Sequence, residues 1–240
     1  MSDNCYDTFW KNGFYIIENV FTPTEIQQLR DEIITYAENK NNLCFNQNGY
    51  SIVDFVKFHP TLIYSKKTID NPVIHKHLNN IFKGDNYRFC LSNDIGVDRH
   101  GPWHKDIMNN GPPGTYIVSH FTTIDIWNTH EGETQQIVKI AIYLQDHENN
   151  NGALEVVPGS HIRREYNTEG SIYTHPKKGD VIIFDQRITH RGISNKSGEP
   201  RILLSFGFGK NNIFTDNFEK GTIIRQDYQH ANMRNKGNIF

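Results

Sequence analysis

The chain has 240 residues, of which 36% are hydrophobic and 12% aromatic, so it can bury the core of one large β domain. Its formal net charge of −2 and sequence pI near 6.6 offer no basic surface for nucleic acid. The three cysteines are odd in number and are not spaced as a zinc knuckle, which favours a reducing compartment. The sequence shows neither a bilayer-spanning segment nor a signal peptide. We therefore expect a cytoplasmic protein with no membrane partner.

The N-terminal part of the chain is predicted to contain most of the helices. Residues 7–18 indicate a short helix, a glycine stop and a strand. The sequence Thr22-Pro23-Thr24-Glu25 combines a capping box with a proline at the first helical position, and the apolar residues that follow have helical spacing. A helix is therefore expected over about 22–39. The Asn- and Gly-rich stretch 40–50 is expected to be a loop.

Two nearby histidines, His75 and His77, would share one face of a strand and could bind a metal there. Pro72 upstream and apolar residues downstream favour a helix around 71–82 instead. Side chains two positions apart on a helix diverge, so we assign this pair no metal and expect both rings to face solvent.

From Tyr87 onward the pattern becomes that of short strands separated by turns rich in Gly, Pro and Asn. Strands are predicted at 87–92, 135–145, 153–157, 181–185 and 201–208. Short strands that follow a helical portion favour a mainly β fold with flanking helices, a jelly-roll barrel with the helices packed outside. We expect one domain over 1–240, with a helical portion to about 86, a β core over about 87–209 and a C-terminal extension, 210–240, that is solvated.

The sequence Pro102-Trp103-His104-Lys105-Asp106 contains the candidate metal ligands. At a strand end, residues two apart point the same way, so His104 and Asp106 could hold one ion. Of the twelve histidines, only His104 has an acid two residues later. His190 follows an apolar strand and could complete the set. Two imidazoles and one carboxylate hold non-heme Fe(II) and leave coordination positions open. The alternative is a surface histidine beside a turn aspartate.

Two cations are candidates for binding an anionic cosubstrate. The open iron positions suit a 2-oxo acid and dioxygen, and the far carboxylate of 2-oxoglutarate needs a fixed cation. Arg201 opens the last predicted strand and supplies a bidentate fork; a surface ion pair is the alternative. Lys139 lies on an otherwise apolar strand face, where a charge is costly unless paired. It either meets an anionic group of 2-oxoglutarate or substrate, or reaches solvent.

Residues 107–134 contain two long polar insertions beside this motif, and such insertions commonly form lids or binding loops. We expect them to form much of a substrate lid. Candidate lining residues are Trp103, Tyr116, His120 and Trp127, each with core packing as the alternative.

The order and spacing of these segments resemble those of the phytanoyl-CoA dioxygenase family of Fe(II)/2-oxoglutarate-dependent oxygenases, from Phe9 to about Phe208. The shared segments are Gly13-Phe14-Tyr15-Ile16-Ile17, Trp103-His104-Lys105-Asp106, Tyr143-Leu144-Gln145-Asp146, 151–161, 178–185, His190-Arg191-Gly192 and Arg201. The resemblance implies a double-stranded β-helix, a cupin-like jelly roll. It also implies that His104, Asp106 and His190 bind iron, that Arg201 holds 2-oxoglutarate, and that His161 has a structural role.

The expected activity is the oxidation of a C–H bond of a small-molecule substrate by Fe(II), 2-oxoglutarate and O2, with release of succinate and CO2. Halogenating relatives lack the carboxylate so that chloride can coordinate; the presence of Asp106 favours hydroxylation or another oxidation. A non-enzymatic jelly-roll binding module and an oxygenase acting on nucleic acid or protein are the alternatives. The sequence identifies neither the substrate nor the oligomeric state.

Overall fold

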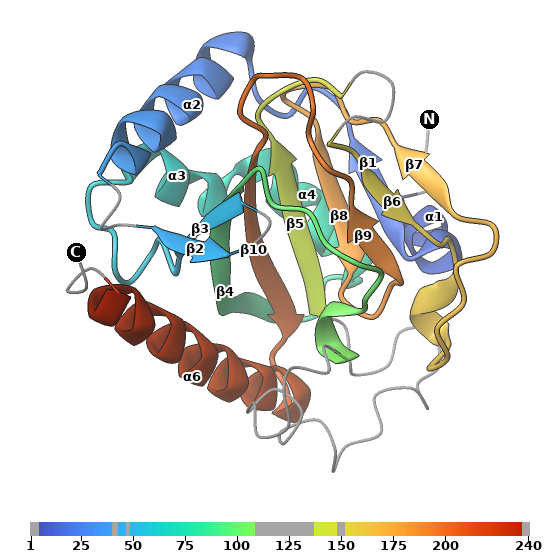
Figure 1. Cartoon of the computed structure of the whole chain (residues 1–240). Helices are drawn as coiled ribbons and strands as arrows, with labels where there is room; N and C mark the ends of the chain where they lie inside the picture. The colour runs from blue at the N-terminus through green and yellow to red at the C-terminus, as the bar shows by residue number, and fades with distance from the viewer. Residues whose placement is uncertain (1–4, 40–42, 47–48, 109–136, 148–151, 237–240) are drawn as a thin grey trace.

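The structure is a computed structural model, and it describes residues 5–39, 43–46, 49–108, 137–147 and 152–236 (Figure 1). The N-terminal elements are α1 (Cys5–Asn12), β1 (Phe14–Ile17), α2 (Pro23–Ala37), β2 (Cys44–Asn46), β3 (Gly49–Val53), α3 (Ile63–Lys67) and α4 (Pro72–Ile81). The later elements are β4 (Tyr87–Val97), β5 (Ile137–Tyr143), β6 (Leu154–Val156), β7 (Ile172–Thr174), β8 (Val181–Asp185), β9 (His190–Gly192), β10 (Ile202–Lys210) and α6 (Ile213–Lys236). No helix in these ranges has the length and apolar character needed to cross a membrane.

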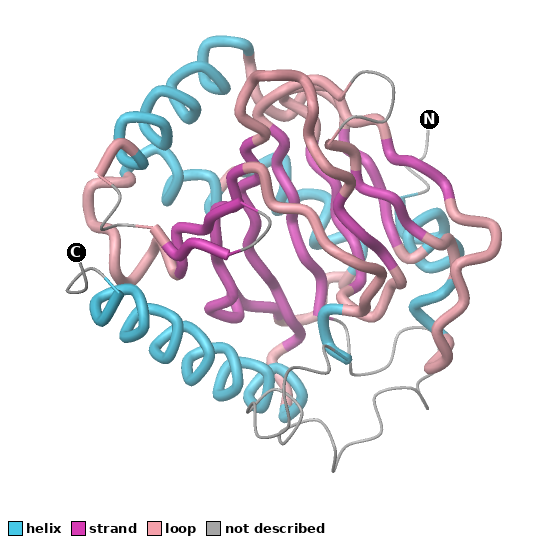
Figure 2. Tube along the Cα trace, in the orientation of Figure 1, coloured by secondary structure: helices cyan, strands magenta, loops and turns pink. Residues whose placement is uncertain are grey.

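The strands form two antiparallel sheets. The larger has seven strands in the order β1-β8-β5-β10-β4-β3-β2, and the smaller has the order β7-β6-β9. Buried residues of β6 pack against the inner face of β5 and β8, so the two sheets face each other, with the helices outside (Figure 2). This arrangement is the predicted jelly roll with flanking helices.

Strand β10 shows how the two-residue period separates core from site. Alternate residues, from Ile202 to Phe208, are buried in the main hydrophobic cluster together with residues of α1, α2 and α4. The residues between them, Leu203 and Ser205, face the opposite side and line a cavity. Helices α1, α2 and α4 therefore cover one face of the large sheet and leave the other face available for ligands.

Local sequence signals account for the N-terminal elements. Thr22 Oγ1 accepts a hydrogen bond from the Glu25 backbone N–H at 3.3 Å, and Glu25 Oε2 accepts one from the Thr22 N–H at 2.8 Å, so the predicted capping box begins α2. Gly13 separates α1 from β1 with φ of +80°, and a Cβ there would lie 2.5 Å from His161 Nδ1. Only glycine fits this position.

Two expectations about the N-terminal half were wrong. The predicted loop 40–50 contains strand β2, which pairs with β3. The predicted helix at 71–82 is confirmed as α4, but its histidines do not face solvent. His77 is buried and stacks on Tyr15, and His75 hydrogen-bonds to the Tyr87 hydroxyl and the Ile69 carbonyl. Both rings face the core because this helix packs on the sheet.

The expected solvated C-terminal extension is also wrong for residues 213–236, which form the long helix α6 beside β4 (Figure 1). Arg88 of β4 anchors the helix through Asp216 at 2.6 Å and Glu219 at 2.8 Å. Three of the buried side chains of α6 are polar, those of Thr215, Thr222 and Gln226, and Phe218 is the buried apolar one. Hydrophobic periodicity therefore could not reveal it.

Candidate active site

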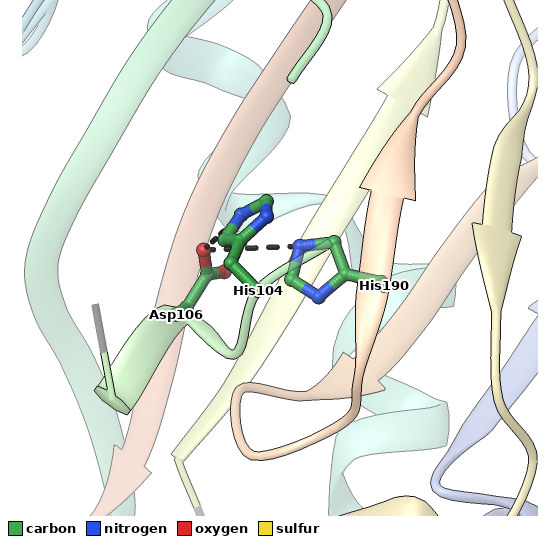
Figure 3. Close-up of side chains that lie close together, drawn as sticks. All are labelled: His104, Asp106 and His190. Atoms are coloured by element: carbon green, nitrogen blue, oxygen red, sulfur yellow. Dashed lines mark ion pairs between the residues drawn. The ribbon is translucent and has the colours of Figure 1, made fainter. Parts of the chain in front are cut away.

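His104, Asp106 and His190 lie close together (Figure 3), and all three line the cavity. His104 and His190 form an isolated antiparallel bridge, in which each backbone N–H donates to the other carbonyl at 2.9 Å. Asp106 does not continue a strand but begins a 3-10 turn, Asp106–Met108. Its side chain nevertheless turns toward the histidines, with Oδ1 3.4 Å from His104 Nε2 and 3.8 Å from His190 Nε2. One ligand atom from each residue lies within 4.8 Å of the others.

Backbone carbonyls determine the tautomer of both imidazoles. His104 Nδ1 lies 2.9 Å from the Pro102 carbonyl, and His190 Nδ1 lies 3.0 Å from the Ile188 carbonyl. A carbonyl can only accept, so each Nδ1 carries a proton, and in the neutral ring the lone pair is on Nε2. Two imidazole lone pairs and one carboxylate oxygen then converge, which fits a divalent transition metal.

The charges of the site suit the same role. Burial opposes ionisation of Asp106, but Lys139 and the two histidines hold the pKa of this carboxyl well below its usual range. Burial, and then the neighbouring His104, lowers the pKa of His190 to about 3. At neutral pH the site therefore presents an ionised carboxylate beside the neutral imidazole of His190.

Lys139 reaches this site from β5. The sequence offered an anionic ligand or solvent as its partner, but Lys139 Nζ donates to Asp106 Oδ2 at 3.0 Å. The lysine side chain is 24% exposed, so it is not a solvent-facing residue. The pairing depends on which strand faces the 104–106 segment, and sequence spacing carries no such information.

Arg201 lies at the start of β10 and is buried, which excludes the alternative of a surface ion pair. Its guanidinium donates to the carbonyls of Gly152 and Arg99, the latter at 2.6 Å, and to the Tyr143 hydroxyl at 3.3 Å. These bonds use three of the five N–H groups of an arginine. Gly152 has φ of +70°, and a Cβ there would lie 2.8 Å from Arg201 Cδ, so glycine leaves room for the guanidinium.

Lys105, which the sequence presented only as the spacer between the two candidate ligands, is completely buried. Its ammonium donates to the Ser160 carbonyl at 2.6 Å and to the Arg187 carbonyl at 2.7 Å. Burial lowers the pKa of this lysine to about 8. Because Arg187 precedes His190 by three residues, Lys105 ties the first two candidate ligands to the segment that carries the third. No spacing or hydrophobic signal marks this residue in the sequence.

The other sequence-predicted residues do not line the cavity or lie outside the described ranges. His161 packs near Trp10, with ring centroids 6.1 Å apart, which fits its expected structural role. Trp103 is half-buried beneath the guanidinium of Arg191, 4.8 Å from the ring centroid. Most of the expected lid, from residue 109 onward, lies outside the described residues, and so do Tyr116, His120 and Trp127.

A cavity of about 1010 Å³ connects the candidate ligands with the two cations. Its lining includes His104, Asp106, His190, Lys139 and Arg201. The size is sufficient for a cosubstrate and a small-molecule substrate together. The site can therefore hold a metal at one point and an anion at Arg201.

Comparisons with known proteins agree with this arrangement. A family model described as phytanoyl-CoA dioxygenase matches residues 9–203. A search of curated proteins found no match.

Solved structures share the fold. HygX from Streptomyces hygroscopicus, with nickel, 2-oxoglutarate and hygromycin B bound, is 15% identical with a TM-score of 0.66, covering 88% of this chain and 88% of that chain. The non-heme α-ketoglutarate-dependent epimerase SnoN, from nogalamycin biosynthesis, is 14% identical with a TM-score of 0.64, covering 89% and 88%. AviO1 from Streptomyces viridochromogenes is 17% identical with a TM-score of 0.61, covering 87% and 94%. At such identities the likeness concerns the fold.

Proposed function

The chain belongs to the phytanoyl-CoA dioxygenase family, and from this premise we propose that it is an Fe(II)- and 2-oxoglutarate-dependent dioxygenase that hydroxylates a small-molecule substrate. The observation that supports the proposal most strongly is the convergence of His104, Asp106 and His190 at a cavity that also contains Arg201. The overall reaction consumes a C–H bond, 2-oxoglutarate and O2, and yields an alcohol, succinate and CO2.

The three converging residues would hold the iron through two imidazole Nε2 atoms and one carboxylate oxygen. When bound, the metal supplies the oxidising chemistry that couples loss of CO2 from 2-oxoglutarate to oxygen insertion. The remaining tasks belong to the protein. Lys139 neutralises and orients Asp106, and the peptide carbonyls beside the two histidines place the proton of each neutral ring on Nδ1, which leaves Nε2 as the ligand atom.

Arg201 would bind the far carboxylate of 2-oxoglutarate with its two remaining N–H groups. Its carbonyl and hydroxyl partners hold the fork in place but leave its charge unpaired by any carboxylate within the described residues. Leu203 and Ala141 line the cavity on the neighbouring β10 and β5 positions. These apolar side chains exclude water from the space where the cosubstrate would lie.

Asp106 also favours hydroxylation over halogenation, since its carboxylate would bind the metal where a halogenating enzyme would need room for a halide. Epimerisation is the second candidate activity, because SnoN, which shares the fold, is described as an epimerase.

The test is aerobic incubation under ¹⁸O2 with Fe(II), 2-oxoglutarate and a small-molecule library. We expect succinate and a product that gains one ¹⁸O atom, both lost in Asp106→Ala. In a parallel incubation with ascorbate, which would supply the two electrons that epimerisation does not take from the substrate, succinate with an isomeric product of unchanged mass would identify an epimerase instead. Absence of metal and 2-oxoglutarate binding in the folded protein would exclude both activities.

A further inference from the structure

The cavity has two chemically different halves on either side of β10. On one side, β5 and β8 contribute Ala141, Tyr143 and Phe184, and Leu154 faces them from β6. Apart from the tyrosine hydroxyl, which accepts from Arg201, these side chains are apolar. This half contains the candidate metal ligands and Lys139.

On the other side of β10 the lining is mainly polar. Strands β4 and β3 contribute Ser92, Asp94 and Ser51, and the facing helix α6 contributes Thr222 and Arg225. Ser205 of β10 and Gln229 of α6 also line this side, and we call these seven residues the polar half. All seven side chains can donate or accept hydrogen bonds, and Phe218 of α6 is an apolar side chain that lines the cavity beside them.

An ion pair between the sheet and the helix lies within the polar half. Arg225 Nη2 lies 2.9 Å from Asp94 Oδ2, and Arg225 Nη1 donates to Gln229 Oε1 at 2.8 Å. The two charged side chains are 20% and 22% exposed, and both line the cavity. Such a pair offers a ligand a donor and an acceptor at fixed positions.

Helix α6, which contributes to the polar half, lies beyond residues 9–203, the part of the chain matched by the family model. It is held firmly, because Phe218 is buried and Arg88 binds two acids of its first turns. The polar half is therefore built partly from a segment that the family pattern does not include. Such a segment is suited to determining which substrate the shared site accepts.

The polar half is unfavourable for an acyl chain. Some of its groups already pair within the protein, since Ser51 Oγ accepts from Arg99 and Ser205 Oγ donates to the Asp94 carbonyl. An apolar chain packed against the remaining donors and acceptors would deprive them of the partners that water provides. A ligand bearing several hydroxyl groups can satisfy the same groups.

The charge of the cavity lining further limits which class of ligand can bind. Four cationic side chains line it within the described residues, Arg99, Lys139, Arg201 and Arg225, against the acids Asp94 and Asp106. The charges of Fe(II) and of the two carboxylates of 2-oxoglutarate would cancel each other. The excess of positive charge disfavours a cationic ligand.

We propose that the polar half binds a hydroxyl-rich, non-cationic ring, a sugar or cyclitol unit of the substrate, and that Asp94 and Arg225 determine specificity for it. The inference rests on the proposed function for placing this ring beside the metal site. The ring would enter the space between β4 and α6, with its reacting carbon directed toward β5.

Saturation-transfer NMR with small rings tests this inference on the full chain loaded with Zn(II) and 2-oxoglutarate. Glucuronate and cyclohexanecarboxylate have the same ring size and charge but differ in hydroxyl groups; myo-inositol is the neutral polyol. We expect glucuronate and myo-inositol to bind with dissociation constants on the order of millimolar, and cyclohexanecarboxylate not to bind. Glucosamine, the cationic sugar, should bind more weakly than glucuronate.

Arg225→Gln should weaken binding of both polyols about tenfold or more, and Thr222→Val, which keeps the side-chain shape, should weaken it in the same direction. Lys220→Gln removes the same charge from an exposed position of α6 and should leave binding unchanged. Preferential binding of cyclohexanecarboxylate, failure of both polyols to bind, or equal binding by Arg225→Gln and Lys220→Gln would each overturn the inference.

The failure of this inference and the failure of the proposed function are distinguishable. Polyol binding that persists in a protein unable to bind metal or 2-oxoglutarate would refute the oxygenase and leave a polyol-binding cavity. Normal metal and 2-oxoglutarate binding without polyol binding would refute only the substrate class.

Discussion

Lys139 and His104 contact different oxygens of the same carboxylate, that of Asp106. The ammonium lies 3.0 Å from Oδ2, whereas His104 Nε2 lies 3.4 Å from Oδ1. The lysine therefore occupies one oxygen and leaves the other directed toward the imidazoles. We expect Asp106 to bind a metal through Oδ1 alone.

Replacing Lys139 with Met should weaken metal binding by about 10- to 100-fold, the usual effect of losing a partner that orients a ligand. The measurement is competition for Co(II) between the protein and a chelator, with the visible Co(II) spectrum reporting the geometry. Lys139→Arg should recover part of the affinity because it restores a donor to Oδ2. Equal affinities in wild type and Lys139→Met would show that this contact does not orient the ligand.

Replacing Arg201 with Ala should raise the dissociation constant of 2-oxoglutarate about thirtyfold or more, roughly 2 kcal/mol, with little change in metal affinity. The reason is the loss of the buried cation that would pair with the far carboxylate. Calorimetric titration of the metal-free protein with Zn(II), followed by titration of the Zn(II)-loaded protein with 2-oxoglutarate, gives both constants. Arg163→Ala, at an exposed position, is the matched control. An unchanged dissociation constant of 2-oxoglutarate in Arg201→Ala would show that another cation binds its far carboxylate.

Lys105→Met should destabilise the folded protein by about 1–3 kcal/mol, because two buried carbonyls, of Ser160 and Arg187, lose their donor. If Lys105 also positions the ligands, the variant should bind Co(II) more weakly and give an altered spectrum at temperatures where it remains folded. Denaturant unfolding measures the first effect separately. Normal Co(II) affinity in the folded variant would limit Lys105 to a stabilising role.

His59 should make stability depend on pH. Burial lowers the pKa of His59 to about 4 from an ordinary 6.5. The unfolded chain therefore binds a proton in the window between these values while the folded protein does not, so stability falls as pH drops from 6.5 to 4. The contribution amounts to about 3 kcal/mol.

Denaturant unfolding of wild type and His59→Gln at several pH values measures this dependence. The variant should lose less stability than wild type between pH 6.5 and pH 4, and above pH 6.5 the two should show parallel behaviour. Identical slopes in that window would show that folding does not lower the pKa of His59.

Local patterns made much of the fold and the candidate site predictable. The capping box at 22–25 and the strand alternation at 135–145 depend on neighbours in sequence. His190 and Arg201 were found because each adjoins an apolar strand, and the strand ends of a jelly roll meet at a cavity.

Features set by long-range packing were not predictable in this way. The Lys139–Asp106 contact depends on how β5 faces the 104–106 segment, and the roles of Lys105 depend on carbonyls 55 and 82 residues away. Helix α6 was missed because its buried side includes Thr215, Thr222 and Gln226, whose burial only the facing strand explains.

The most direct test of the central claim is anaerobic titration of the protein with Fe(II) and 2-oxoglutarate, observed through the weak visible charge-transfer band of the metal–cosubstrate chelate. We expect a saturable band in wild type and in Arg163→Ala, no band in His104→Ala, and a band in Arg201→Ala only at much higher 2-oxoglutarate concentration. A folded wild-type protein that gives no band under these conditions would contradict the oxygenase assignment and leave a jelly-roll binding module as the account of this chain.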